Sequence, residues 1–413
     1  MNPGAILLAG LVATVGLIAS LSVGLTEMNL PRRPEQAIRF RGDDGAALSR
    51  LAERRLGIGA DPRQLAAARV EARAALLRSP LEAGAMRALG SAAAREGRLD
   101  DADRFMAAAS RRTLRHTRTQ LWHVYRGLQL GDAARIALAA DTVLRRRPAE
   151  SDGLFPILLH LVQSEPATGG PVAERLALGP PWRSGFIDWA AEDGPTPLIA
   201  YRLLSGLRAT DRPPTDREMA AYLRRLIKDD QHQAAYVAWA QHLPRDRRRR
   251  FDLVYDGGFD RAPGIAPFDW TTGSDPALMV EIGAPLGGGQ ALFVETMGGG
   301  AATAVEQMLV LPPGRYRLTG RSLTETGIEP ERLVMQVACI RDARTRGVLL
   351  GATSPGAESL DWRPIAVDFT VPPQCPAQRL AVLSRPGDTV QPLAVWFDDL
   401  AVRHVASAEE PDA

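Results

Sequence analysis

The chain has 413 residues, of which 45% are hydrophobic and 24% are charged, and its formal net charge is +2. Because one hydrophobic core rarely serves more than ~250 residues, this length predicts two or three domains. The small net charge excludes a strong field of one sign, so no general affinity for nucleic acid is expected.

The first element is an uncharged apolar run at residues 5–25 (AILLAGLVATVGLIASLSVGL). A helix of about 20 apolar residues is long enough to cross the ~30 Å hydrocarbon core of a bilayer. Only Ser20 and Ser22 offer a weak cleavage site, so an uncleaved transmembrane anchor over 1–30 is predicted rather than a removed signal peptide. We therefore expect a single-pass protein of a bacterial-type inner membrane, with the membrane as a partner of residues 5–25.

The sequence gives conflicting indications of the orientation of this predicted anchor. Four arginines follow the apolar run and no basic residue precedes it, which by the positive-inside rule would keep the bulk of the chain in the cytoplasm. The two cysteines of the C-terminal region, Cys339 and Cys375, suit an oxidising compartment and favour the periplasmic side. We expect a periplasmic bulk, with the cytoplasmic orientation left open.

The next region, 35–245, is rich in Ala, Leu and Arg, and a 34-residue spacing runs through it. Gly97 and Gly131, each followed by an Asp- and Ala-bearing turn (GRLDDA and GDAA), are 34 residues apart. Leu89-Gly90, Ala102 and Ala109 occupy the spacings at which a tetratricopeptide repeat places its Leu-Gly and small residues. Repeats at about 46–163 therefore resemble that family, which implies an α-helical solenoid that binds protein partners.

The match to the repeat is degenerate, so an irregular helical bundle remains the alternative. His123-Val124 stands where Leu-Gly is expected, and Ile136 replaces a small alanine. After Gln163 the period ends at loop signals, and capping helices are expected over about 182–245.

Beyond residue 251 the helical periodicity stops and short alternating runs appear between Gly- and Pro-rich turns. This pattern predicts an antiparallel β-sandwich at 251–405, followed by a disordered tail at 406–413. The whole chain is thus predicted to be a multidomain α plus β protein with an N-terminal transmembrane helix. The expected strands are Ala291 to Glu295, Ala304 to Leu311, Arg315 to Ser322, Arg332 to Cys339, Ile365 to Val371, Arg379 to Leu383 and Leu393 to Val402.

Several short motifs in this region resemble jelly-roll carbohydrate-binding modules in their type and order. They are YDGGFD (255–260) with PFDW (267–270), LPPGRYRLTGRS (311–322), DWRPIAVDFTVP (361–372) and VWFDDLAV (395–402). The resemblance implies a two-sheet jelly roll and a polysaccharide or glycan ligand.

The same resemblance implies one structural calcium ion held by acidic residues from both ends of the domain. The matching positions are Asp260 and either Asp398 or Asp399, and their oxygen donors suit Ca²⁺. The family usually has Glu where this chain has Asp260, so simple turn or edge-strand carboxylates are the alternative. No other cofactor is expected.

Four aromatic residues are candidates for sugar-binding platforms: Trp270, Tyr316, Trp362 and Trp396. Trp270 and Trp362 follow Asp at strand starts, and Trp396 alternates with apolar neighbours, which favours core packing for each. The only cysteines, Cys339 and Cys375, predict one disulfide in an oxidising compartment, or two small buried hydrophobes if they stay reduced.

Catalytic signatures are missing from the sequence. The six histidines are scattered without an HExxH motif, and the glycine-rich loops lack the Lys-Ser/Thr of a phosphate-binding loop. The sequence therefore predicts a membrane-anchored, non-catalytic binding or assembly protein that supports an envelope exopolysaccharide synthesis or export system. A purely structural interaction scaffold without a sugar ligand is the alternative, and a glycan hydrolase is the weaker one.

Overall fold

The chain forms two compact units, Met1–Trp182 and Arg183–Ala413, in a computed structural model. The tail at 406–413, expected to be disordered, lies outside the described residues. The structure describes residues 20–25, 28–29, 33–40, 44–57, 59–164, 170–248, 252–285, 288–297, 300–327, 329–340, 347–359, 361–387 and 391–405.

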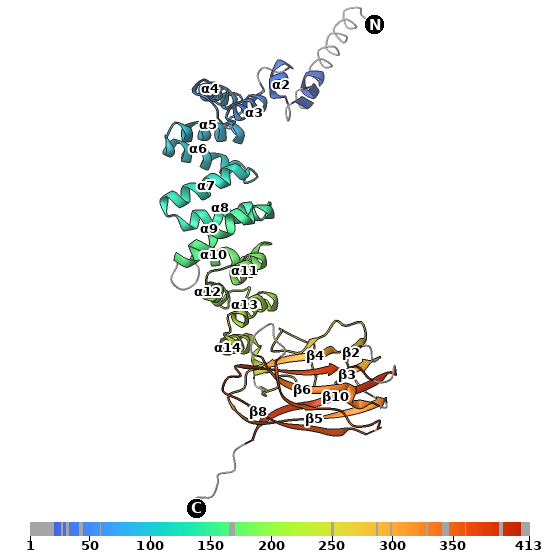
Figure 1. The fold of residues 1–413 in the computed structure, drawn as a ribbon. Helices are drawn as coiled ribbons and strands as arrows, with labels where there is room; N and C mark the ends of the chain where they lie inside the picture. Colours follow the sequence, from blue (N-terminus) through green and yellow to red (C-terminus); the bar gives the residue numbers. More distant parts are fainter. Residues whose placement is uncertain are drawn as a thin grey trace, which may run out of the picture. The chain divides into compact units, whose positions relative to one another are not determined.

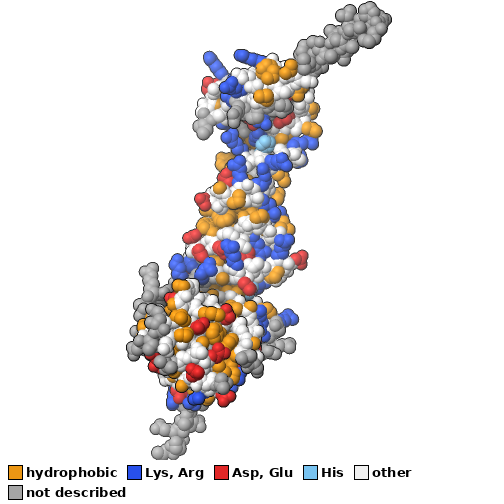
Figure 2. All heavy atoms as spheres, turned by 90° about the vertical axis from the view of Figure 1, so that its right-hand side faces the viewer, with side chains coloured by type: hydrophobic (Ala, Val, Ile, Leu, Met, Phe, Trp, Pro, Cys, Tyr) orange, Lys and Arg blue, Asp and Glu red, His pale blue; other side chains and the backbone are white. Residues whose placement is uncertain are grey.

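The first unit is helical, and helices that follow one another in sequence pack on one another (Figure 1). Helix α3 packs on α4, α5 on α6 and α7 on α8, while Figure 2 shows arginine side chains spread over this part of the surface. The helices are α2 (Pro34–Phe40), α3 (Gly45–Arg55), α4 (Pro62–Arg78), α5 (Ala83–Arg95), α6 (Leu99–Arg112), α7 (Thr117–Leu130), α8 (Ala133–Leu144), the 3-10 turn η1 (Pro148–Glu150), α9 (Ser151–Ser164) and α10 (Gly170–Ala177).

The turns between these helices are set by glycine and aspartate. Gly97 and Gly131 adopt left-handed conformations with φ of 76° and 69°, which a residue without a Cβ does at little cost. Asp132 then caps α8 by accepting a hydrogen bond from the Arg135 backbone N–H. The two 34-residue-spaced turns thus end one helix and start the next.

Small residues bring the paired helices together. Ala68, Ala75, Ala102 and Ala109 are each at most 1% exposed. At the α7–α8 pair the small residue is Gly127, where an added Cβ would lie 2.6 Å from Ile136 Cγ1. A helical region is therefore confirmed, while its assignment to the tetratricopeptide family stays a prediction.

The predicted transmembrane helix is not found. No helix in the described part of the chain is both long and apolar enough to cross a bilayer. Residues 5–19 of the predicted segment lie outside the described residues. The predicted fold class is wrong in this element, and the single-pass inner-membrane placement is corrected with it.

The second unit begins with helices and continues into the strands. A buried ion pair between Arg183 and Glu218, with Nη2 and Oε2 2.8 Å apart, joins α11 to α13. Glu218 also completes a capping box with Thr215 at the start of α13. The helices are α11 (Arg183–Glu192), α12 (Pro197–Leu207), α13 (Asp216–Lys228), α14 (His232–His242) and α15 (Arg245–Arg248).

Two antiparallel five-stranded sheets follow, and they confirm the predicted β-sandwich (Figure 1). One sheet has the order β1-β4-β9-β6-β7 and the other β2-β3-β10-β5-β8. Their inner faces form one hydrophobic core. The strands are β1 (Thr271–Thr272), β2 (Leu278–Gly283), β3 (Ala291–Thr296), β4 (Ala302–Leu309), β5 (Gly314–Thr326), β6 (Leu333–Ile340), β7 (Val348–Thr353), β8 (Arg363–Val371), β9 (Ala377–Ser384) and β10 (Leu393–His404), and the 3-10 turn η2 (Pro330–Arg332) precedes β6.

Helix α14 packs on the sandwich through aromatic rings. Trp239 lies 5.0 Å from Tyr255 and 5.5 Å from Phe268, measured between ring centroids. The Gln307 side chain on β4 binds both the backbone N–H and the carbonyl of Tyr255. The loop before β1 is therefore fixed between this helix and the first sheet.

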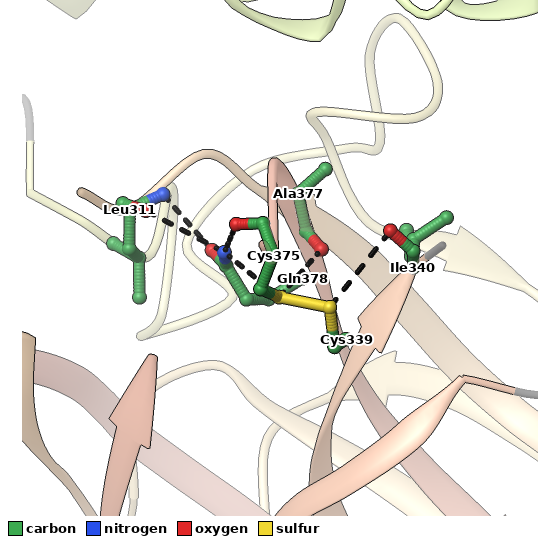
Figure 3. The surroundings of a disulfide bond; sticks show 6 residues. All are labelled: Leu311, Cys339, Ile340, Cys375, Ala377 and Gln378. Atoms are coloured by element: carbon green, nitrogen blue, oxygen red, sulfur yellow. Dashed lines mark hydrogen bonds between the residues drawn. A yellow bond between two sulfur atoms is a disulfide. The ribbon is translucent and has the colours of Figure 1, made fainter. Parts of the chain in front are cut away.

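Cys339 and Cys375 form a disulfide with a Cα–Cα distance of 5.6 Å (Figure 3). Cys339 lies in β6, and Cys375 lies in the turn before β9. The side chain of Gln378 donates to the Cys375 carbonyl and accepts from the Leu311 backbone N–H. The disulfide thus belongs to a network that joins β6 to the β8–β9 and β4–β5 connections.

Candidate functional site

Trp396 stands on the outer face of the β2-β3-β10-β5-β8 sheet. Its neighbours along β10, Val395 and Phe397, are both fully buried in the core. Because successive side chains of a strand point to opposite faces, the indole of Trp396 must point away from that core. The ring is half-buried, which leaves part of it in contact with solvent.

Phe293 lies beside this ring on the neighbouring strand. Trp396 is paired with Phe293 of β3 and Leu323 of β5, and Phe293 is paired with Glu281 of β2. Directly paired residues in antiparallel strands share a face, so these four side chains form a row across the sheet. The Trp396 and Phe293 ring centroids are 4.8 Å apart.

Glu325 fixes the orientation of the indole. Its Oε1 accepts a hydrogen bond of 2.8 Å from Trp396 Nε1. Gly283 borders the other side, where an added Cβ would lie 3.6 Å from the Trp396 ring. We call Glu281, Phe293, Leu323, Glu325 and Trp396 the Trp396 face.

A second aromatic group, Trp362, lies immediately before β8. The guanidinium of Arg321 sits over the Trp362 ring, 4.6 Å from its centroid. Arg321 also makes ion pairs with Asp398 (2.5 Å) and Asp399 (2.9 Å). The ring of Trp362 is thus covered on one side by a cation that is already neutralised.

The other two predicted aromatic residues belong to the core. Trp270 is 4% exposed, packs on Phe259, and donates its indole N–H to the Asp256 carbonyl. Tyr316 is 3% exposed and donates its hydroxyl to the Pro312 carbonyl. Neither ring can serve as a platform for a sugar.

The predicted calcium ligands lie near one another. A Cβ added to Gly258 would lie 3.4 Å from Asp260 Oδ2 and 3.7 Å from Asp398 Oδ1. However, Asp398 Oδ1 also accepts from the Asp399 backbone N–H, and Arg321 binds both Asp398 and Asp399. Within the described ranges no three acidic, His or Cys residues are placed to hold a metal ion. The guanidinium supplies the positive charge here, and this donor set does not fit calcium.

The outer face of the opposite sheet has a different character. Within the described bounds of β1, β4, β9, β6 and β7 there is no aromatic residue. An ion pair of 3.3 Å between Arg379 and Glu306 crosses from β9 to β4. Among the described strand residues, aromatic side chains therefore occur in only one of the two sheets.

A serine–histidine contact in the first unit invites a catalytic interpretation. Ser110 Oγ lies 2.9 Å from His123 Nε2, and Arg135 Nη2 lies 2.8 Å from His123 Nδ1. Because arginine only donates, Nδ1 must accept, and the neutral ring carries its proton on Nε2. Burial, and then the charge of Arg135, lowers the pKa of His123 and keeps the ring neutral. In this tautomer His123 cannot take a proton from Ser110, so the pair is not an activated nucleophile.

Sequence reasoning missed Glu281, Phe293 and Glu325. The strand ALFVET alternates between core and surface, but both kinds of position hold apolar residues, so its pattern does not reveal which ones face outward. Glu281 on β2 and Glu325 on β5 do not belong to any recognisable sequence motif. Only the pairing register places Phe293 beside Trp396 and Glu281 beside Phe293, and only the folded sheet brings Glu325 to the indole.

No family model matches this chain, and no curated protein does. Among solved structures, a TmCBM61 module in complex with β-1,4-galactotriose is 15% identical, with a TM-score of 0.25, covering 38% of this chain and 99% of that one. The CBM22-1 xylan-binding domain of Paenibacillus barcinonensis Xyn10C is 17% identical, with a TM-score of 0.28, covering 37% and 94%.

A CBM4 structure is similar at 14% identity, with a TM-score of 0.27, covering 37% of this chain and 99% of that one. The C-terminal region resembles carbohydrate-binding modules. TM-scores this low carry no argument about ligand or activity, which must come from the residues of this chain.

Proposed function

We propose that this chain is a non-catalytic binding protein whose sandwich binds a polysaccharide on the Trp396 face. The observation that carries the proposal is the Trp396–Phe293 pair on the outer face of a sheet, with carboxylates beside it. An aromatic ring packs against the C–H face of a sugar, and carboxylates accept hydrogen bonds from its hydroxyls.

The charges around the ring favour a neutral glycan. Glu325 binds the Trp396 indole and Glu281 pairs with Phe293, whereas Arg321 is already paired with Asp398 and Asp399. A polysaccharide rich in uronate would bring further negative charge to this face and would be repelled. The proposed ligand is therefore an uncharged polysaccharide.

The helical unit supplies the second part of the proposed function, which is the recruitment of protein partners. Its successive helix pairs with small residues between them support a tetratricopeptide-like solenoid, an architecture that presents extended surfaces. We further propose that the chain supports an exopolysaccharide synthesis or export system. In this role the sandwich binds the glycan and the helices bind a partner protein. The pairing of these two folds in one chain supports this role.

The test is affinity electrophoresis of the full chain through gels that contain xylan, galactan, mixed-linkage β-glucan or polygalacturonate. At least one neutral polysaccharide should retard the chain, and Trp396→Ala should abolish the retardation. Leu349→Ala removes an apolar residue that is 53% exposed on the opposite sheet, so it should change nothing.

Equal retardation of the wild type and Trp396→Ala would contradict the proposed site. If no polysaccharide retards the chain, the proposal fails and an interaction scaffold without a sugar ligand replaces it. Retardation by polygalacturonate alone would contradict the neutral ligand.

A further inference from the structure

The first unit contains an open cavity of about 930 Å³ whose charged wall residues are mostly arginines. Arg87 and Arg95 come from α5, Arg118 from α7, and Arg115 and Arg147 from the segments that flank α7 and α8. We call this cavity the arginine groove.

Negative charge within the groove does not balance these cations. The acidic residues in its walls are Glu53 and Glu150, and Glu53 is already ion-paired with Arg87. Arg118 and Arg147 are exposed, and neither forms an ion pair with any residue that the structure describes. Several like charges facing one cavity repel each other until an anion enters.

Arg87 is the fixed centre of the groove. It is only 9% exposed, and its Nη2 is held by Glu53, while its Nη1 has no hydrogen-bond partner among the described residues. A buried guanidinium N–H without a hydrogen-bond partner destabilises the folded protein, so this nitrogen is available to donate to an acceptor on a ligand. Arg95 is held by the Leu56 and Gly57 carbonyls. Two of the cations are thus oriented before any ligand arrives.

The electrostatics of the surrounding groups agree with this geometry. Burial lowers the pKa of Arg87 to about 10, with further contributions from the charges of Arg118 and Arg50. Burial, then Arg87 and other arginines, lowers the pKa of His116, which also lines the groove. His116 is therefore held neutral, and the arginines carry the positive charge.

The remaining walls of the groove are apolar. Leu56 and Met106 are buried, and Leu121 and Trp122 are half-buried. Trp122 is held through a 2.9 Å hydrogen bond from its indole to Asp103. An acidic polysaccharide has no side chains to bury against these residues, whereas a peptide with acidic and apolar side chains matches both kinds of wall.

We propose that the arginine groove binds an acidic peptide segment of a partner protein, with its carboxylates on Arg87, Arg118 and Arg147 and its apolar side chains against Leu56 and Met106. This inference deepens the protein-recruiting part of the proposed function. It does not depend on the glycan site, because the groove lies wholly in the first unit.

The test uses the full chain and a fluorescein-labelled synthetic peptide of alternating Glu and Leu, with a matched peptide of Gln and Leu, in fluorescence anisotropy titrations. The acidic peptide should bind, and the neutral one should bind at least about tenfold more weakly. Arg118→Glu with Arg147→Glu should weaken binding of the acidic peptide by at least about tenfold, and added salt should weaken it further.

The matched control is Arg63→Glu with Arg111→Glu, which reverses two exposed arginines of the same unit outside the groove. The affinity of this control variant for the acidic peptide should stay within about twofold of that of the wild type. Arg87→Met tests the buried centre, and thermal melting checks that this variant is folded. If Arg87→Met does not fold, the variant with Arg118→Glu and Arg147→Glu alone decides the outcome.

Three results would overturn the inference. They are equal binding of the two peptides, equal losses in the groove and control variants, and tighter binding of oligogalacturonate than of the acidic peptide. Loss of peptide binding in a variant that still binds a neutral polysaccharide separates this site from the glycan site.

Discussion

Asp269 is a buried carboxyl group in the loop before β1. It is 3% exposed and accepts hydrogen bonds from the backbone N–H groups of Trp270 and Gly264. Burial raises its pKa from 3.8 to about 6, against the opposing effect of those two hydrogen bonds. Since the folded state holds this proton more tightly than the unfolded state, stability from this group is present at low pH and declines as the pH rises through about 4 to 6.

Asp269 should therefore give the second unit an unusual pH dependence. Between pH 4 and pH 6.5 its ionisation should lower the free energy of unfolding by up to ~3 kcal/mol. Asp269→Asn cannot ionise, so its free energy of unfolding should lack this decline. Urea unfolding of both proteins, followed by tryptophan fluorescence across this range, measures the difference. Identical pH profiles would show that Asp269 does not carry the effect.

At the scale of the element, the α7–α8 pair depends on one missing side chain. An added Cβ at Gly127 would lie 2.6 Å from Ile136 Cγ1 and 3.2 Å from the Asp132 carbonyl oxygen. Ile136 is 1% exposed, so it has little room to move. The missing side chain at Gly127 therefore leaves the space that the bulky side chain of Ile136 fills.

Gly127→Ala should reduce the free energy of unfolding by about 1–3 kcal/mol, because the new methyl group overfills the contact. Gly153→Ala in α9 is the matched control. Nothing lies within 4 Å of its added Cβ, and alanine favours a helix, so this variant should be neutral or slightly stabilising. In an Ile136→Ala background, where Cγ1 is absent, Gly127→Ala should cost less than it does in the wild type. Equal effects of the two glycine substitutions would contradict the steric explanation.

This contact also shows where sequence reasoning works for the helices and where it stops. The turns at Gly97 and Gly131 were predictable, because a left-handed glycine followed by an acidic helix start is a local signal. The exchange of size between Gly127 and Ile136 was not, because the repeat pattern places a small alanine where Ile136 stands and assigns no role to Gly127. Packing partners nine residues apart become visible only when two helices face each other.

For the strands, local patterns predicted the sandwich but left the site unresolved. The run VWFDDLAV is apolar at both core and surface positions, so Trp396 could not be separated from Phe397 by alternation. The predicted acidic cluster at Asp260, Asp398 and Asp399 did come together, but with Arg321, a residue 77 positions from Asp398 along the chain. Pairing between distant strands decided both results.

At the scale of the whole molecule, α11 to α14 group with the sandwich in one compact unit. The change in sequence texture at residue 251 does not show this grouping, because it arises from ring contacts between segments. Trp239 is 1% exposed and packs on Tyr236, Tyr255 and Phe268. These contacts join the last helices to the loop before β1.

Trp239→Ala should therefore destabilise the helices and the sandwich of the second unit together. Loss of a buried tryptophan costs about 3–5 kcal/mol, which should lower the melting temperature of that unit by roughly 10 °C. Val237→Ala on the same helix, at a position 43% exposed, should have little effect. Differential scanning calorimetry should show a shift in one transition while the transition of the first unit stays in place. Equal shifts in both would contradict this coupling.

The proposed function requires that Trp396 and Phe293 together form a platform for an uncharged sugar chain. Isothermal titration calorimetry of the full chain with soluble neutral oligosaccharides, such as xylohexaose and β-1,4-galactotriose, tests it most directly. We expect measurable binding of at least one of them, weakened by at least about tenfold in Trp396→Ala and Phe293→Ala but unchanged in Leu349→Ala. Binding that is as strong in Trp396→Ala as in the wild type would contradict it.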